Sequence, residues 1–178
     1  MSLLLDTAKG SLRATVVVPG SKSIANRALV CAALASGTST LQNLASGDDT
    51  AAMIDCLRAL HIDVIVEGTT ATIVGSSGRP NGGGELNARL AGTTSRFMTA
   101  VAALSTVPSL ITGDAPLRLR PMKPLHDALV QLGAQVKSVD TEGHLPVWVS
   151  GDSIEGGTVS IPGDVSSQYV TALMMIGP

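Results

Sequence analysis

The segment MIDCLRALHIDV at residues 53–64 recurs as LHDALVQLGAQV at residues 125–136, and the two copies align without a gap. Asp55 and Asp127, for example, are 72 positions apart. In each copy, apolar residues recur at positions i, i+3, i+4 and i+7, the spacing of one face of an amphipathic helix. These residues are Met53, Cys56, Leu57 and Leu60, and then Leu125, Ala128, Leu129 and Leu132. The match predicts two related helices in an internal repeat.

Each predicted helix is followed by alternating apolar residues around a glycine-containing turn. The two runs are VIVEGTTATIVG, which ends at Gly75, and VKSVDTEGHLPVWVSG, which ends at Gly151. Alternation of this kind around such a turn is typical of a β-hairpin. The offset between the copies grows to 76 at these two glycines, so the second hairpin is expected to have the longer loop.

Three glycines upstream of the helices extend the repeat. Gly20 and Gly92 are 72 positions apart, and Gly163 follows 71 positions later. Each glycine follows a short strand-like run and precedes a helix of small residues. The runs lie at residues 16–18, 86–90 and 159–161, and the helices at 28–35, 97–104 and 170–176. The repeating unit is therefore a βαβαββ block of about 72 residues.

These blocks predict an α/β (α+β) fold with two complete units and a truncated third. We expect residues 20–178 to form one domain, with units at about 20–90 and 91–161 and the start of a third at 162–178. Residues 1–19 are expected to form a lead-in strand.

The third unit contains one helix, whose apolar side chains would need a partner. They are Tyr169, Val170, Leu173, Met174, Met175 and Ile176. Burying such a set is worth roughly 10 kcal/mol or more. This is comparable to the net stability of a domain, so we expect the chain to be a fragment of a longer protein.

Composition excludes several classes of protein. The 178 residues include 12 Lys and Arg against 14 Asp and Glu, and 44% are hydrophobic but only 2% aromatic. Such a chain is too apolar to be disordered, and it lacks the basic face and aromatic platforms of a nucleic-acid binder. No apolar run approaches the roughly 20 residues that span a bilayer, and the N-terminus has no basic region of a secretory signal. We expect a cytoplasmic protein with no nucleic-acid or membrane partner.

Cysteine and histidine positions give no sign of a metal or redox site. Cys31 and Cys56 lie in apolar helical patterns without C-x-x-C spacing, so both are predicted to be reduced core thiols. The three histidines are His61, His126 and His144. None of them has another ligand residue at metal-binding spacing. His61 stands where the second copy has Gly133, and we expect it to tolerate the left-handed backbone of a helix C′ position.

The three predicted helix starts are the candidate functional site. They are Gly20-Ser21-Lys22-Ser23 with Asn26 and Arg27, Gly92-Thr93-Thr94-Ser95-Arg96, and Gly163-Asp164-Val165-Ser166-Ser167-Gln168. Glycine lets the backbone approach a ligand closely, and the first-turn N–H groups and the helix dipole favour an anion there. Each start taken alone is also compatible with an ordinary Ser or Thr cap.

Recurrence and charge favour anion binding over simple capping. Half of the twelve basic residues lie at these starts or in the segment 118–123: Lys22, Arg27, Arg96, Arg118, Arg120 and Lys123. If the units repeat about a pseudo-threefold axis, the starts converge at one end of the domain and form a pocket for several anions. Known phosphate loops do not explain this pocket, because Lys22 follows Ser21 rather than the Gly of a Walker A motif. Similarly, Gly82-Gly83-Gly84 opens no helix and is interpreted as a linker.

Four segments resemble, in this order and spacing, the N-terminal half of the 5-enolpyruvylshikimate-3-phosphate synthase family. They are PGSKSIANRALVCAALASG at 19–37, LAGTTSRF at 90–97, RLRPMKPLHDAL at 118–129 and GDVSSQYVTALMM at 163–175. The resemblance implies an inside-out barrel of two domains, each with three βαβαββ units. It also implies transfer of the enolpyruvyl group of phosphoenolpyruvate to the 5-hydroxyl of shikimate 3-phosphate, in chorismate biosynthesis, with no metal or cofactor.

The matched motifs imply roles for individual residues. For shikimate 3-phosphate these are Ser23, Arg27, Ser166 and Ser167. For phosphoenolpyruvate they are Gly92 and Arg120, with Thr93 and Arg96 as further candidates. Lys22 is implied to be the catalytic residue of this chain, as a cation shared by both substrates, and Gln168 would lie near both ligands. In the family the acid and base carboxylates lie in the second domain, which this chain is expected to lack. The fragment alone should then be inactive, and residues 1–19 could pack on that domain.

One departure from the family and two alternative functions bear on this interpretation. The family pattern G-N-A-G-T is replaced by Arg89-Leu90-Ala91-Gly92-Thr93, so Leu90 stands in place of an asparagine. The sister family that acts on UDP-N-acetylglucosamine has an Asn at the position of Ser23 and a reactive Cys near Asp114-Ala115-Pro116, neither of which is present here. The second alternative is a non-catalytic phosphate-binding half-module.

Overall fold

The computed structural model describes residues 9–151 and 154–177. The first unit contains α1 (Lys22–Leu34), β1 (Thr38–Leu41), α2 (Asp48–Ala59), β2 (Asp63–Glu67) and β3 (Thr70–Val74). The second contains β4 (Gly84–Asn87), α3 (Gly92–Ala102), β5 (Ser109–Thr112), a short α4 (Ala115–Arg118), α5 (Lys123–Gln131), β6 (Gln135–Ser138) and β7 (Val147–Ser150). It is followed by α6 (Ser167–Ile176).

The two sheets have matching topologies, which confirms the repeat. The first has the strand order β1-β3-β2, and the second has the order β4-β5-β7-β6. Both predicted hairpins are present as antiparallel pairs, with Val64 opposite Ile73 and Val136 opposite Val149. β4 pairs in parallel with β5, and this strand has no counterpart in the first sheet.

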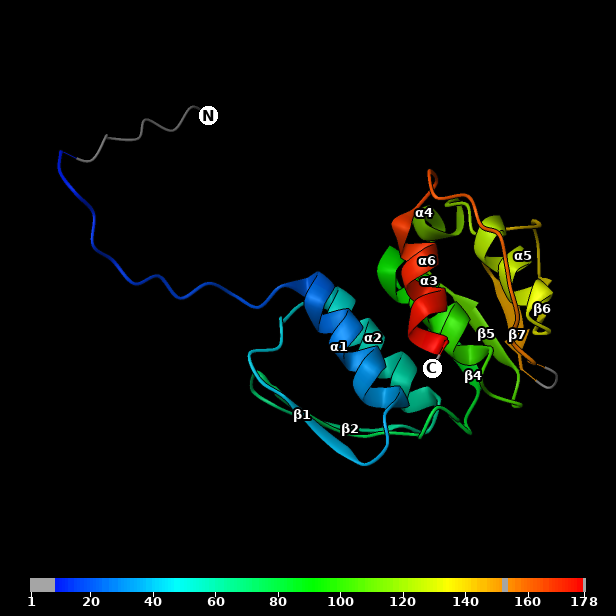
Figure 1. Cartoon of the computed structure of the whole chain (residues 1–178), viewed down its shortest axis with the longest axis horizontal. Helices are drawn as coiled ribbons and strands as arrows, with labels where there is room; N and C mark the ends of the chain where they lie inside the picture. Colours follow the sequence, from blue (N-terminus) through cyan, green and yellow to red (C-terminus); the bar gives the residue numbers. More distant parts are fainter. Residues whose placement is uncertain (1–8, 152–153, 178) are drawn as a thin grey trace.

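Two predicted strands are wrong within the described residues. Residues 16–18 form no strand, and their valines are exposed, Val17 by 92%. This segment runs as an extended chain away from the helices (Figure 1), where no neighbouring strand meets its backbone groups. Residues 159–161 also form no strand. The first unit is therefore αβαββ among the described residues, rather than a complete block.

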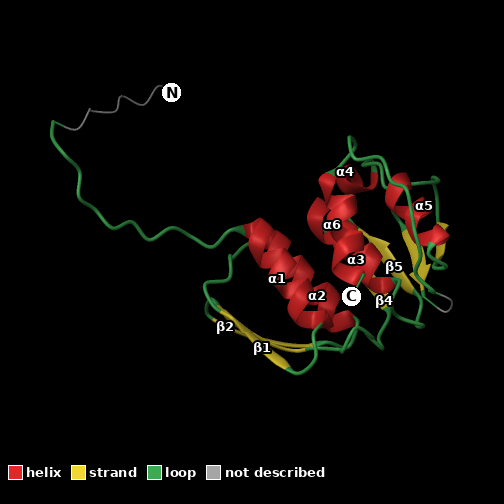
Figure 2. Ribbon diagram, in the orientation of Figure 1, coloured by secondary structure: helices red, strands yellow, loops and turns green. Residues whose placement is uncertain are grey.

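The helices α1, α2, α3 and α6 lie between the two sheets, as Figures 1 and 2 show. The apolar faces predicted for the two repeated helices are confirmed, because Met53, Leu57, Leu125 and Leu129 are fully buried. The helices α1, α3 and α6 pack against one another beside α2. This arrangement brings together the N-terminal ends of elements that are far apart in the sequence.

The last helix is partly covered by this chain itself. α6 packs mainly on α3 and buries Tyr169 and Ala172 completely. The Tyr169 hydroxyl donates a hydrogen bond to the carbonyl oxygen of Pro121. Met174, on the other side of the helix, is 72% exposed. Only part of the predicted apolar set therefore lacks a partner among the described residues.

Two glycines close the hairpins onto the first helix of their own unit. A Cβ atom on Gly75 would overlap the carbonyl oxygen of Ala35, just after α1. A Cβ atom on Gly151 would overlap the carbonyl oxygen of Ala103, just after α3. Glycine is required at both positions for the same steric reason, a close approach of two backbone segments.

The cysteine predictions are confirmed for one thiol and wrong for the other. Cys56 is buried, and desolvation, assisted by the nearby Asp55 carboxylate, raises its pKa to about 12. Cys31 is exposed, because it lies on the face of α1 opposite Leu29 and Ala33. Both thiols are free, as predicted.

The left-handed helix ends agree with the prediction. His61 has φ of 58°, and its repeat counterpart Gly133 has φ of 97°. His61 thus adopts the C′ conformation that glycine adopts in the second unit.

Candidate anion-binding site

The first two helix starts present uncapped backbone N–H groups. The N-cap residues of α1 and α3 are Ser21 and Ala91, and neither makes a side-chain capping hydrogen bond. The N-terminal N–H groups of these helices therefore remain available to an anion. α6 differs, because the Ser166 hydroxyl accepts a hydrogen bond from the Gln168 N–H at 3.3 Å. At this helix start the serine therefore acts as an ordinary N-cap, the alternative to anion binding that the sequence allows at each start.

Gly92 lies against two guanidinium groups. A Cβ atom at this position would be 2.8 Å from Nη1 of Arg120 and 3.0 Å from Nη1 of Arg96. A larger residue would require one of these guanidinium groups to shift, so glycine lets both cations lie close to the first turn of α3. Two positive charges and open N–H groups make this the most anion-attracting part of the site.

Gln168 connects the starts of α3 and α6. Its Oε1 accepts a hydrogen bond from Nη1 of Arg96 at 2.7 Å, and its Nε2 donates to Oγ1 of Thr93 at 3.1 Å. The Arg96 guanidinium also lies 5.3 Å from the centre of the Tyr169 ring. The structure thus brings together five predicted residues: Gly92, Thr93, Arg96, Arg120 and Gln168.

The first helix start is linked to this cluster through α2. Lys22 Nζ lies 2.8 Å from Asp49 Oδ2, and the Asp49 carbonyl oxygen accepts a hydrogen bond from Oγ1 of Thr94 at 3.2 Å. Arg27 lies 5.3 Å above the ring of Phe97 in α3 and donates to the carbonyl oxygen of Ser23 at 2.9 Å. The first helix start therefore lies beside the second one. Among the described residues, Gln168 makes no hydrogen bond to Lys22, Ser23 or Arg27.

Other candidates of the sequence analysis have different surroundings. Ser167 is exposed at the first residue of α6. Asn26 is fully buried, with no hydrogen-bond partner for its side chain within the described structure, so it presents no surface to a ligand. Arg118 donates to the carbonyl oxygen of Gly113 at 2.6 Å. Lys123 binds acidic residues outside the cluster.

Asp49 is the main site residue that the sequence analysis missed. Acidic residues at a helix N-terminus are common because they complement the helix dipole, so its position gave no signal for a contact with Lys22. The pairing depends on how α1 and α2 pack, which the repeat alone does not determine.

Comparison with known proteins decides the family. Residues 7–178 match the sequence profile of EPSP synthase (3-phosphoshikimate 1-carboxyvinyltransferase). The chain belongs to the EPSP synthase family. It is 38% identical over 173 residues to the 3-phosphoshikimate 1-carboxyvinyltransferase of Colwellia psychrerythraea, covering 95% of this chain and 41% of that protein.

Two further family relatives support the match. The chain is 37% identical over 186 residues to the pentafunctional AROM polypeptide of Komagataella phaffii, covering 99% of this chain and 12% of that protein. The structure of EPSP synthase from Acinetobacter baumannii superposes with a TM-score of 0.81 at 26% identity, over 91% of this chain and 37% of that one. The chain spans about 40% of the length of curated family members such as the Colwellia protein.

Five cavities of about 210 to 500 Å³ stand out in the described part of the chain. None of these five is lined by Lys22, Gly92 or Gln168. The helix starts come together through the contacts of Gln168 and Asp49, and the pocket expected between them stays a prediction. Among residues 9–151 and 154–177 there is no cluster suited to a metal ion, and no helix is long and apolar enough to cross a membrane.

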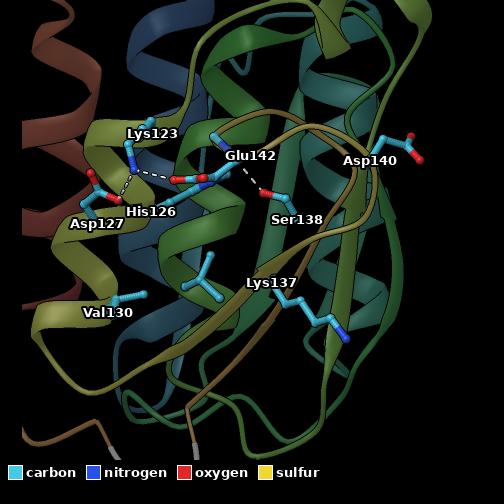
Figure 3. Close-up of a pocket in the computed structure, with 10 residues that line it drawn as sticks. Lys123, His126, Asp127, Val130, Lys137, Ser138, Asp140 and Glu142 are labelled. Atoms are coloured by element: carbon cyan, nitrogen blue, oxygen red, sulfur yellow. Dashed lines mark hydrogen bonds and ion pairs between the residues drawn. The ribbon is translucent and has the colours of Figure 1, made fainter.

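A separate cavity of about 450 Å³ lies under the longer loop of the second hairpin (Figure 3). Lys123 Nζ binds Asp127 Oδ1 at 3.1 Å and Glu142 Oε1 at 2.7 Å at its edge. His126 lines it, is only 5% exposed, and has no hydrogen-bond partner for Nε2 among the described residues. Burial lowers the pKa of His126 to about 4; Asp127 opposes this shift, while His144 and Lys123 add to it.

His126 is expected to make stability depend on pH. Its folded pKa lies below its unfolded value of 6.5, so the stabilisation is complete above that pH and is lost as the pH falls toward about 4. Between about pH 8 and about pH 4.5, the loss attributable to this residue is on the order of 2 to 3 kcal/mol. Urea unfolding of wild type and His126→Leu at both pH values measures it, because the variant should lose that much less on acidification.

The matched control is His61→Asn, which removes an exposed histidine from a left-handed position that asparagine also tolerates. This variant separates the effect of the buried His126 from the effect of removing an imidazole elsewhere in the chain. If His126→Leu also kept the wild-type pH dependence, the claim that His126 is buried in its neutral form would be refuted.

Proposed function

We propose that this chain supplies part of the site that transfers the enolpyruvyl group of phosphoenolpyruvate to the 5-hydroxyl of shikimate 3-phosphate. The products are 5-enolpyruvylshikimate 3-phosphate and phosphate, in the biosynthesis of chorismate and aromatic amino acids. The observation that supports it best is the cluster of Arg96, Arg120 and Gln168 around the open helix start at Gly92. The family membership gives the chemistry to which this cluster is suited.

Charge is the first requirement of the reaction. Both substrates are multiply charged anions, and fixed cations must neutralise and align them before the hydroxyl attacks. Gly92 and Arg120 are proposed to hold phosphoenolpyruvate, with Thr93 and Arg96 beside them. For shikimate 3-phosphate the proposed contacts are Ser23, Arg27, Ser166 and Ser167. Lys22 and Gln168 are proposed to lie near both ligands, because Gln168 binds Arg96 and Thr93, and Lys22 is linked to α3 through Asp49.

The proton transfers require groups from elsewhere. The reaction needs an acid for the methylene carbon and a base for the hydroxyl. We assign these to a second domain that completes the site from the other side and that residues 1–19 could contact. The exposed surface formed by the helix starts is consistent with one wall of such a two-sided site. The protein is proposed to act in the cytoplasm, without a metal or cofactor.

Calorimetric titration tests the substrate assignment. Shikimate 3-phosphate is expected to give saturable binding to the chain, whereas UDP-N-acetylglucosamine is expected to give none, because the sister family differs at Ser23. Phosphate release from phosphoenolpyruvate should occur only when a polypeptide carrying the remaining part of a relative is added. A preference for UDP-N-acetylglucosamine would refute the substrate. Binding without any turnover after complementation would favour the non-catalytic half-module.

A further inference from the structure

Arg89 has an unusual backbone conformation immediately before the start of α3. Its φ is 52°, in the left-handed region that side-chain-bearing residues rarely adopt. Glycine adopts this conformation at little cost, so the turn carries a side chain that its backbone does not require. A residue that is conformationally unfavourable is retained more readily if its side chain does something there.

The side chain of Arg89 binds two carboxylates of α2. Nη2 lies 2.6 Å from Asp55 Oδ2, and Nη1 lies 3.3 Å from Asp48 Oδ1. Asp48 and Asp55 are seven positions apart, close to two helical turns, and so lie on one face of α2. One guanidinium thus spans that face and ties it to the turn between β4 and α3.

The backbone of Arg89 is held from two other directions. Its N–H donates to Asn87 Oδ1 at 2.9 Å, and its carbonyl oxygen accepts a hydrogen bond from Asp114 N at 2.8 Å. A Cβ atom on Gly113 would be 2.7 Å from the same carbonyl oxygen, so the segment that leads to Arg120 lies directly against it. Arg89, three positions before Gly92, therefore contacts β4, α2 and the segment at residues 113–114.

The next residue of α2 completes the connection to the first helix start. Asp49 binds Lys22 at 2.8 Å, whereas its neighbour Asp48 binds Arg89. Adjacent carboxylates at the N-terminus of α2 thus hold one cation from the first unit and one from the second. The two contacts therefore link Lys22 and the segment before Gly92 to the same end of α2.

We propose that Arg89 is a positioning residue that fixes the turn before Gly92 relative to Lys22. It acts through Gly92 and Asp48 rather than on a substrate. Without its guanidinium, the turn loses its ion pairs with α2, and the second helix start shifts relative to the first. The ligand in this inference, phosphoenolpyruvate, rests on the proposed function.

The test compares Arg89→Gly, which keeps the left-handed backbone without the side chain, with Arg89→Lys. Titration of phosphoenolpyruvate, with shikimate 3-phosphate present, should show Kd raised about threefold to fivefold in Arg89→Gly and partly restored in Arg89→Lys. The Kd for shikimate 3-phosphate and the thermal midpoint should change little. Arg79→Gly is the control, because Arg79 is exposed and makes no ion pair within the described part of the chain.

Two outcomes would overturn the positioning role. One is an unchanged Kd for phosphoenolpyruvate in Arg89→Gly. The other is an equal loss for both ligands together with a lower thermal midpoint, which indicates a merely structural residue.

A ligand-free measurement separates this inference from the proposed function. If the wild type binds neither ligand, the proposed function fails, but the amide NMR shifts of Lys22 and Gly92 still report on the turn. They should move in Arg89→Gly and stay unchanged in Arg79→Gly. Unmoved shifts in Arg89→Gly would refute the positioning role by themselves.

Discussion

Gly151→Ala is expected to lower the free energy of unfolding by about 3 kcal/mol or more. The new Cβ atom would overlap the carbonyl oxygen of Ala103, and backbone atoms cannot move aside as a flexible side chain can. The shift would also strain the hydrogen bond from the Gly151 N–H to the carbonyl oxygen of Ser105, at 2.7 Å. For a chain of this length the thermal midpoint should fall by roughly 10 °C, as measured by calorimetry.

The repeat supplies a second instance and a control. Gly75→Ala should cost a similar amount, because Gly75 makes the equivalent approach to Ala35 in the first unit. Gly163→Ala should have little effect, since a Cβ atom there would meet nothing within 4 Å. Equal stability of Gly151→Ala and Gly163→Ala would show that the hairpin does not close onto α3 as described.

Lys22→Ala is expected to weaken the binding of shikimate 3-phosphate by about 1.5 to 3 kcal/mol, which is roughly tenfold to hundredfold in Kd. The ammonium group is exposed beside the start of α1 and makes an ion pair only with Asp49 among the described residues. It therefore remains available to a phosphate or carboxylate group. Loss of the charge removes its contacts with the ligand, and calorimetric titration measures the change.

Lys137→Ala makes the same change of charge at the edge of the cavity under the second hairpin, away from the helix starts. It should leave Kd within about twofold of the wild type, because exposed distant charges are screened by salt. If both lysine variants weakened binding equally, the effect would be one of net charge and not of a contact at α1. Arg27→Ala should resemble Lys22→Ala if Arg27 also binds the ligand.

The helices and hairpins could be predicted because their signals are local. The spacing of Met53 and Leu57, repeated in Leu125 and Leu129, predicts buried helix faces that the structure confirms. The same holds for the left-handed end at His61. Residues 16–18 have strand-like composition, but a strand also needs a neighbour, and its existence depends on chain far away in the sequence.

The candidate site could be predicted in part for a similar reason. Glycine and basic residues at recurring positions indicated Gly92, Arg120 and Gln168 as members of one surface. The partners of Lys22 and Arg89 on α2 could not be predicted, because exposed acids such as Asp49 have no distinctive sequence pattern. The pocket between the helix starts stays a prediction, since the sequence shows which helix ends converge but not what encloses them.

The convergence of the helix starts is best tested by titrating the ¹⁵N-labelled chain with shikimate 3-phosphate and recording backbone amide shifts. The amides of Lys22, Gly92 and Gln168 should move together and fit a single dissociation constant. Shifts confined to one helix start, or centred on His126 and the cavity beside it, would contradict a shared anion-binding surface.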